Sequence, residues 1–173
     1  MRTLLLAPCL LACAVSAAAD APITGLDRLA AVLPGTWRTV GQTFDSPITK
    51  AGPQGYTTVH DCWREQDAYK CVYVVNGTLQ LYDIYSWDAG NGLYGMTQIT
   101  PQGRQPEFHV SVKDNTLTYD QDIQTQDGQV IHYRIVRNYT SAVNADYEYE
   151  YSADGKAWTT IAKGIDTRID APK

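Results

Sequence analysis

The sequence predicts an all-β fold: an antiparallel up-and-down β-barrel of about ten strands with a short N-terminal helix. Three observations predict it. Strand-like runs follow one another from Thr36 to Arg168, turn-forming residues separate them, and the connections leave no room for a crossover helix. Parallel strands would need such a crossover, whereas short connections pair sequence neighbours. A meander of this length either becomes a sandwich or closes into a barrel, and we prefer the barrel because closure alone removes the sheet edges.

Residues 1–19 have the three regions of a secretory signal peptide: a positive charge at Arg2, an apolar run over Leu4–Val15 and small residues at Ala17–Ala19. Cleavage after Ala19 leaves residues 20–173 as a single lipid-free domain of ordinary size. We therefore expect a periplasmic or secreted protein. The apolar run is too short to cross a bilayer as a helix, and no later run comes near that length, so no transmembrane segment is expected.

A second interpretation of the same segment stays open. Leu10-Leu11-Ala12-Cys13 is similar to a bacterial lipobox, which would make Cys13 the lipidated first residue of an anchored lipoprotein. We prefer cleavage after Ala19, because the apolar core before Cys13 is short and is interrupted by Pro8.

The acidic balance of the chain argues against two classes of partner. The formal net charge is −5, and it becomes −6 when Arg2 leaves with the signal peptide. Lys and Arg residues are scattered and form no basic stripe, so we expect neither nucleic acid nor an anionic membrane surface as a partner. A small-molecule ligand stays open, and the composition does not decide the oligomeric state.

Two cysteines, Cys62 and Cys71, remain after cleavage, and their spacing predicts a disulfide. In "CWREQDAYKC", a two-residue turn at Gln66-Asp67 places Cys62 opposite Cys71 on two antiparallel strands. Counted from that turn they form a non-hydrogen-bonded pair, with Cα atoms about 4.5 Å apart and within disulfide reach. An oxidising compartment favours the bond. The spacing does not fit a CxxC metal or redox centre.

One helix is expected before the strands. The apolar residues that recur at helical spacing are Leu26, Leu29, Ala30 and Leu33. Thr24 and Asp27 have the spacing of a capping box at the start of this helix, and Pro34-Gly35 ends it.

About ten strand-like runs follow, separated by residues that form turns. The runs centre on Arg38–Thr43, Thr57–Trp63, Tyr69–Val75, Leu79–Trp87, Leu93–Thr100, Glu107–Val112, Thr116–Gln124, Val130–Tyr139, Asp146–Tyr151 and Trp158–Arg168. The turn residues between them are Asn76-Gly77, Gly90-Asn91-Gly92, Pro101-Gln102-Gly103, Asp114-Asn115, Asp127-Gly128 and Asp154-Gly155.

The segment "LPGTW", Leu33–Trp37, follows the expected helix and is similar to the Gly-x-Trp signature that opens the first strand of lipocalins and their calycin relatives. The resemblance implies that Trp37 lies at the closed end of the barrel, with a basic residue of a late strand across its ring. Arg168, in "GIDTR", is the residue that matches. Such a cation–π contact stabilises by about 1–2 kcal/mol when it is partly buried.

More narrowly, the chain from residue 20 onward resembles a group of bacterial exported, lipocalin-like proteins of unassigned function. That group has a "GTW" start, a "YxxD" strand and a "YSxDGxxW" hairpin, which Tyr82-Asp83 and Tyr151–Trp158 match loosely. The chain lacks the later loop motifs of typical lipocalins and their helix between barrel and C-terminus. The resemblance therefore does not imply transport of a lipophile.

The sequence has no recognisable catalytic or metal-binding motif: no GxSxG, no HExxH and no glycine-rich phosphate loop after a strand. His60, His109 and His132 lie on three separate runs, so they either meet inside the barrel or face water. Barrels of the nitrobindin type hold haem through a histidine, but "GTWRTVGQT" reproduces their glycine motif only in part. We expect no metal and no cofactor.

Tyrosines are the distinctive feature of the late strands, and they predict a polar interior. Three tyrosines in Tyr147–Tyr151 alternate with Glu148 and Glu150, which places the phenols inside and the carboxylates in solvent. By the same period, the residues predicted to bind a ligand are Asp83, Tyr85, Arg137 and Tyr149. A buried charge needs a partner, so Arg137 should pair either with Asp83 or with an acidic aromatic ligand, and we prefer the ion pair.

Three functions stay open. The first is a binding protein for a small amphipathic or aromatic ligand, because such pockets are mainly apolar with a few polar groups. The second is an enzyme of the isomerase or cyclase type that uses Tyr, Asp and Arg side chains at the barrel mouth. The third is a structural or interaction protein with a filled core. An interior acid with a raised pKa would favour the enzyme, and a filled interior would leave only the structural role.

Overall fold

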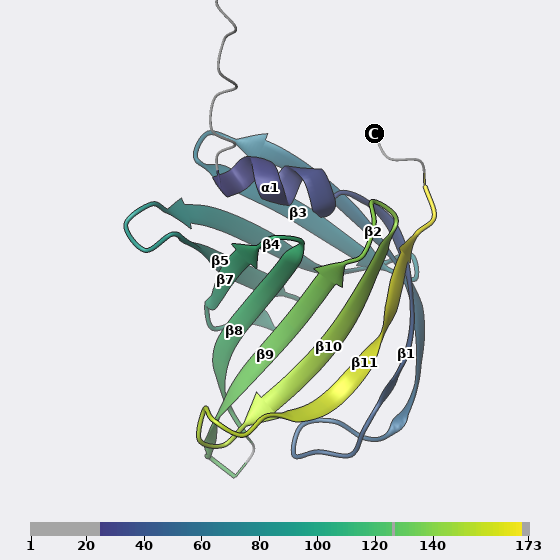
Figure 1. The fold of residues 1–173 in the computed structure, drawn as a ribbon, viewed down its shortest axis with the longest axis vertical. Coiled ribbons are helices and arrows are strands. Elements are labelled where there is room, and N and C mark those ends of the chain that lie inside the picture. Colours follow the sequence, from purple (N-terminus) through teal and green to yellow (C-terminus); the bar gives the residue numbers. More distant parts are fainter. Residues whose placement is uncertain (1–24, 126, 171–173) are drawn as a thin grey trace, which may run out of the picture.

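The computed structural model describes residues 25–125 and 127–170 and has the predicted fold class (Figure 1). Ten antiparallel strands form a closed up-and-down barrel, and a short helix, α1 (Gly25–Val32), lies at one end of it. The expected signal peptide, Cys13 and Thr24 of the expected capping box lie outside the described residues. None of the described helical structure is long and apolar enough to cross a membrane.

The strands coincide with the predicted runs, except that β2 begins at Gly52, well before the predicted Thr57. The strands are β1 (Gly35–Thr43), β2 (Gly52–Glu65), β3 (Ala68–Val75), β4 (Thr78–Asp88), β5 (Leu93–Thr100), β6 (Gly103–Arg104), β7 (Phe108–Lys113), β8 (Thr116–Gln124), β9 (Val130–Tyr139), β10 (Asn144–Ser152) and β11 (Thr159–Arg168). The two-residue strand β6 was not predicted. It pairs with β5 and is not one of the ten barrel strands.

Each barrel strand pairs with its neighbours along the chain, as the short connections predict. Strand β5 pairs with both β4 and β7, so the meander continues past β6. Strands β1 and β11 lie side by side in Figure 1, and their pairing, with Trp37 opposite Arg168, closes the barrel. The first and last strands therefore share a seam.

The hairpin of β2 and β3 has the predicted turn, register and disulfide. Gln66 adopts a positive φ of 52° in the two-residue turn, and Cys62 lies opposite Cys71. Their Cα atoms are 4.1 Å apart, and a disulfide joins the two residues. Because the closed loop is short, the expected stabilisation is about 2–3 kcal/mol.

Apolar side chains fill the barrel end that carries α1. Three residues of the predicted helical face, Leu26, Leu29 and Leu33, pack into the hydrophobic core together with Trp37. The fourth, Ala30, is exposed, so the buried face is narrower than predicted. Only 4 % of Trp37 is exposed, and the guanidinium of Arg168 lies over its indole, with Cζ 4.9 Å from the ring centroid. This is the contact that the lipocalin resemblance implies, and it joins β1 to β11.

Two glycines allow β1 and β11 to approach closely at the seam. Gly41 lies opposite Gly164, and a Cβ added to Gly41 would overlap the Tyr147 hydroxyl and the carbonyl oxygen of Lys163. The Tyr147 hydroxyl passes over these glycines and donates to Gln54 Oε1 at 2.6 Å. Gly41 and Gly164 therefore leave no room for a Cβ atom, and any other residue would push the two strands apart.

Candidate functional site

A cavity of about 220 Å³ lies inside the barrel. Its apolar lining residues are Val75, Leu81 and Ile135; its tyrosines are Tyr56, Tyr73, Tyr85, Tyr119 and Tyr149; its other polar residues are Thr58, His60, Asp83, Gln98 and Arg137. These side chains come from seven strands, β2 to β5 and β8 to β10. The structure therefore brings the four predicted site residues, Asp83, Tyr85, Arg137 and Tyr149, to one cavity, and their role in binding stays a prediction.

Asp83 is a buried acid without a cation beside it. It is only 4 % exposed, and it accepts hydrogen bonds from Gln98 Nε2 at 3.1 Å and from the Tyr85 hydroxyl at 3.4 Å. Within residues 25–125 and 127–170, no ion pair reaches its carboxylate. Burial raises the pKa of Asp83 from 3.8 to about 6, and the hydrogen bonds and, to a smaller extent, the charge of Arg137 offset only part of this shift.

Arg137 pairs with Asp166, so the predicted ion pair with Asp83 is wrong. Arg137 Nε lies 3.3 Å from Asp166 Oδ2, and Asp166 Oδ1 accepts a hydrogen bond from the Thr39 hydroxyl at 2.6 Å. The reason is the order of strands around the barrel: β11 is two strands from β9, whereas β4 lies nearly opposite. Burial is the largest single influence and lowers the pKa of Arg137, but Asp166 and the neighbouring tyrosines together outweigh it and hold that pKa well above its ordinary value.

Sequence reasoning missed Asp166, although a signal for it was present. Asp166 and Arg168 are two residues apart on β11, so both face the same side of the sheet. The lipocalin resemblance places Arg168 inside, and the strand period extends that assignment to Asp166. The side chain of Asp166 is indeed buried, with 4 % exposure.

Tyr73 and Tyr85 extend the polar group around Asp83. The hydroxyl oxygens of these tyrosines are 3.3 Å apart. Because the Tyr85 hydroxyl donates to Asp83, Tyr73 must donate to Tyr85. Burial raises the pKa of both phenols well above 10, which keeps them neutral. Both contacts exceed the usual O–H···O distance of about 2.7–2.8 Å, so a ligand can compete for these hydroxyls.

His60 faces the interior, whereas His109 and His132 lie on the outer wall, so the three histidines do not meet. His60 Nδ1 lies 2.9 Å from the Leu33 carbonyl oxygen, which can only accept, so Nδ1 carries the proton. Nε2 then accepts from the Thr58 hydroxyl at 3.1 Å. Burial lowers the pKa of His60 to about 3, which leaves the imidazole uncharged near neutral pH.

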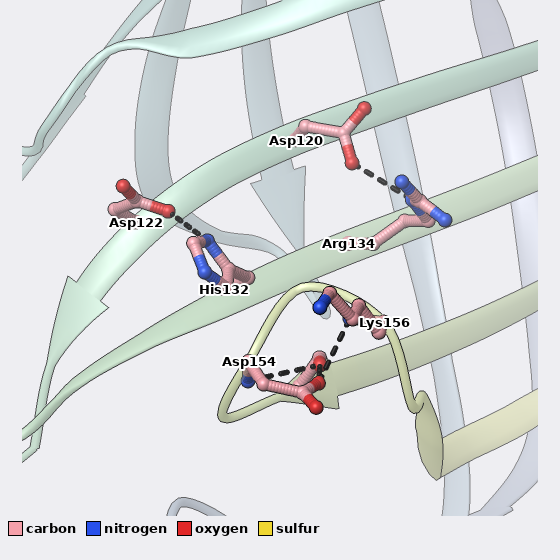
Figure 2. Close-up of polar contacts among 7 residues, drawn as sticks. Asp120, Asp122, His132, Arg134, Asp154 and Lys156 are labelled. Atoms are coloured by element: carbon pink, nitrogen blue, oxygen red, sulfur yellow. Dashed lines mark hydrogen bonds and ion pairs between the residues drawn. The ribbon is translucent and has the colours of Figure 1, made fainter.

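A second group of polar side chains lies on the outer wall (Figure 2). Figure 2 labels its members, which are Asp120, Asp122, His132, Arg134, Asp154 and Lys156. The pairs Asp120–Arg134 and Asp122–His132 each have an N···O distance of 2.7 Å, but every side chain in them is at least 32 % exposed. Asp154 organises the β10–β11 loop by accepting from the backbone N–H of Lys156 at 2.8 Å. Water screens such pairs, so this group is not the candidate site.

The outer wall also has a larger hollow, of about 620 Å³, over β9, β10, β11 and β1. Gly41 and Gly164 are among its lining residues, and the charged groups Asp146 and Lys163 around it are exposed. The interior cavity instead contains buried groups with shifted pKa values, which concentrate at functional sites. We therefore take the smaller, interior cavity as the candidate site.

The described part of the chain contains no candidate metal centre, because none of its His, Cys, Asp and Glu side chains form a group of three or more that could hold a metal ion.

Comparisons with known proteins add a structural similarity and no family. No family model matches the sequence, and no curated protein matches it. The crystal structure of Rv2717c from M. tuberculosis is similar, with a TM-score of 0.49 and 14 % sequence identity over 87 % of this chain and 99 % of that one. A similarity at this level supports no statement about function. Membership in the lipocalin-like exported group stays a prediction.

Proposed function

We propose that this barrel is an exported binding protein that holds a small amphipathic or aromatic ligand in its interior cavity. The observation that carries the proposal is the cavity itself: a space of about 220 Å³ lined by tyrosines and aliphatic side chains, with a few convergent polar groups. Ligand sites of proteins commonly have this composition. The disulfide Cys62–Cys71 supports export, because such bonds persist in oxidising compartments.

The volume limits the size of the ligand. An engineered apolar cavity of about 150 Å³ binds benzene, so about 220 Å³ suits one ring with a short chain. Pockets for drug-sized ligands usually measure about 300–1,000 Å³. A long-chain lipophile therefore fits poorly, and a completely filled core, the basis of the structural alternative, is disfavoured by the same cavity.

An enzyme of the isomerase or cyclase type is the second candidate, and one observation favours it. The raised pKa of Asp83, about 6, is close to the value that suits a general acid or base near neutral pH. The Tyr85 hydroxyl next to it would serve as a hydrogen-bond donor that orients the acid. NMR spectra of a bound ligand, recorded over hours, test this candidate: signals of a new isomer that do not form with Asp83→Asn would support catalysis.

Two measurements test the binding proposal. Native mass spectrometry of the protein from its own cells should detect a copurifying small molecule. A thermal-shift screen of one-ring compounds should then give hits that Ile135→Trp abolishes, because Ile135 lines the cavity and an indole would fill it. The matched control is Val136→Trp, whose side chain lies on the outer wall of the same strand.

If binding of the hits persists in Ile135→Trp and is lost in Val136→Trp, the ligand binds in the outer hollow and not in the interior cavity. A screen without hits, together with a ligand-free native mass, would contradict the binding function.

A further inference from the structure

The charges around the cavity do not balance. Arg137 has its counter-ion in Asp166, which the Thr39 hydroxyl also holds. Asp83 has only neutral donors, Gln98 and Tyr85. With Asp83 ionised, the cavity wall therefore carries one uncompensated negative charge.

We infer that the ligand is a small amine of one-ring size, and that the carboxylate of Asp83 is the counter-ion of its ammonium group. The inference rests on the proposed binding function and names the chemical class of the ligand. A buried carboxylate without a cation is costly, and an ammonium group in the cavity would remove that cost. The cationic partner that the fold omits is therefore supplied by the ligand.

The tyrosines of the cavity fit the same ligand. Tyr73 and Tyr85 are buried beside Asp83, and their phenol rings line the cavity. A cation over an aromatic face gains up to about 2 kcal/mol when it is desolvated. The aliphatic side chains of Val75, Leu81 and Ile135 provide an apolar wall for the ring or chain of the amine.

An acidic ligand fits the cavity less well. Its carboxylate would have to share the Arg137 guanidinium with Asp166, whose carboxylate is already 3.3 Å from Nε. It would also introduce a second anion into the space that Asp83 lines. Like charges in one buried site repel each other and shift one pKa strongly. The expectation from sequence that Arg137 could hold an acidic aromatic compound therefore loses its support.

The pH dependence of binding reports on Asp83. The other charged or basic groups near it are His60, Arg137 and Asp166, and the pKa of His60 is lowered to about 3 while that of Arg137 is raised. The phenols facing the cavity are Tyr56, Tyr73, Tyr85, Tyr119 and Tyr149, and the pKa values of the first four are raised. A primary amine stays protonated up to about pH 9, so we assign to Asp83 any change in affinity between pH 5 and pH 7.5.

The test compares three probes with the same ring and a two-carbon chain: phenethylamine, phenethyl alcohol and phenylacetate. Isothermal titration calorimetry at pH 7.5 should show the amine binding at least tenfold more tightly than the alcohol, with phenylacetate weakest. The amine affinity should be about tenfold lower at pH 5, where a group with a pKa near 6 is about one-tenth ionised. Asp83→Asn should abolish both the preference and its pH dependence. Asp61→Asn, an exposed control with the same charge change, should keep both.

The outcomes separate the two proposals. Equal binding of the alcohol and the amine, or tightest binding of phenylacetate, would overturn the amine inference and leave the binding function intact. Amine binding that Asp83→Asn does not weaken would also overturn it. No binding of any of the three probes would contradict the binding function itself for ligands of this size.

Discussion

Burial raises the pKa of Asp83 to about 6, so at pH 7.5 the folded protein keeps an ionised carboxylate away from water. The folded pKa lies above the unfolded value near 3.8, which means that the folded state binds this proton more tightly. The protonated Asp83 side chain therefore contributes fully to the stability of the folded state below about pH 4, and this contribution is lost as the pH rises through 6. A residue that lowers stability near neutral pH fits a role in ligand binding better than a role in packing.

We predict that Asp83→Asn stabilises the protein at pH 7.5. The neutral amide keeps an acceptor for Gln98 and removes the buried charge, so the free energy of unfolding should rise by roughly 2–3 kcal/mol, as the pKa shift implies. At pH 4 the variant and the wild type should be nearly equal. Urea unfolding at both pH values checks this, and a variant less stable than the wild type at pH 7.5 would refute it.

The Arg137–Asp166 pair should behave as a buried structural ion pair. Asp166→Asn leaves the guanidinium without its counter-ion and should cost about 3–5 kcal/mol, and Arg137→Met should cost a similar amount. The double variant should cost clearly less than the sum, as a double-mutant cycle in urea would show. Additive losses would mean that the two side chains are not coupled.

The matched control for this cycle is the outer pair Arg134–Asp120. Its N···O distance of 2.7 Å is shorter, but its side chains are 32 % and 41 % exposed. Asp120→Asn should therefore cost less than about 1 kcal/mol.

At the scale of single elements, the sequence predicted what local chemistry decides. The two-residue turn at Gln66-Asp67 fixes the β2–β3 register, and with it the Cys62–Cys71 disulfide. The sequence also predicted that the side chains of Tyr147 and Tyr149 point inward. It did not predict the bulge in the β10–β11 pairing between Tyr149 and Glu150, because a bulge depends on the twist of the assembled sheet rather than on local preference.

The seam between β1 and β11 gives a prediction about one element pair. Gly41→Ala should destabilise by about 1–3 kcal/mol or more, because the new methyl group overlaps the Tyr147 hydroxyl and the backbone of β11. Gly55→Ala, on the neighbouring strand, is the control: a Cβ there meets nothing within 4 Å. Thermal unfolding of both variants should separate them, and equal melting temperatures would argue against the close seam.

At the scale of the whole molecule, the contact of Trp37 with Arg168 reinforces the β1–β11 pairing that closes the barrel. Trp37→Ala should cost about 3–5 kcal/mol as the truncation of a buried aromatic side chain. Arg168→Lys loses the planar group that covers the indole and donates to the Pro34 carbonyl. Because it keeps the positive charge and leaves Trp37 in place, it should cost measurably less than Trp37→Ala. A loss below about 1 kcal/mol for Trp37→Ala in urea unfolding would contradict this role.

The interior cavity marks the limit of what the sequence could predict. Strand alternation placed Asp83, Tyr85, Arg137 and Tyr149 inside, because alternation is a local property. The partner of Arg137 could not be read in the same way, since it depends on which strands lie side by side after closure. The cavity volume depends on how all the side chains fill the barrel together, so neither its size nor its charge balance follows from any one strand.

The central claim is that a one-ring ligand enters this cavity, and intermolecular NOEs test it most directly. Protein with labelled Ile, Leu and Val methyl groups, mixed with phenethylamine, should give NOEs from the ring protons to Val75, Leu81 and Ile135. NOEs confined to the outer methyl groups of Val136 and Ile165, or none at all at saturating ligand, would contradict the claim.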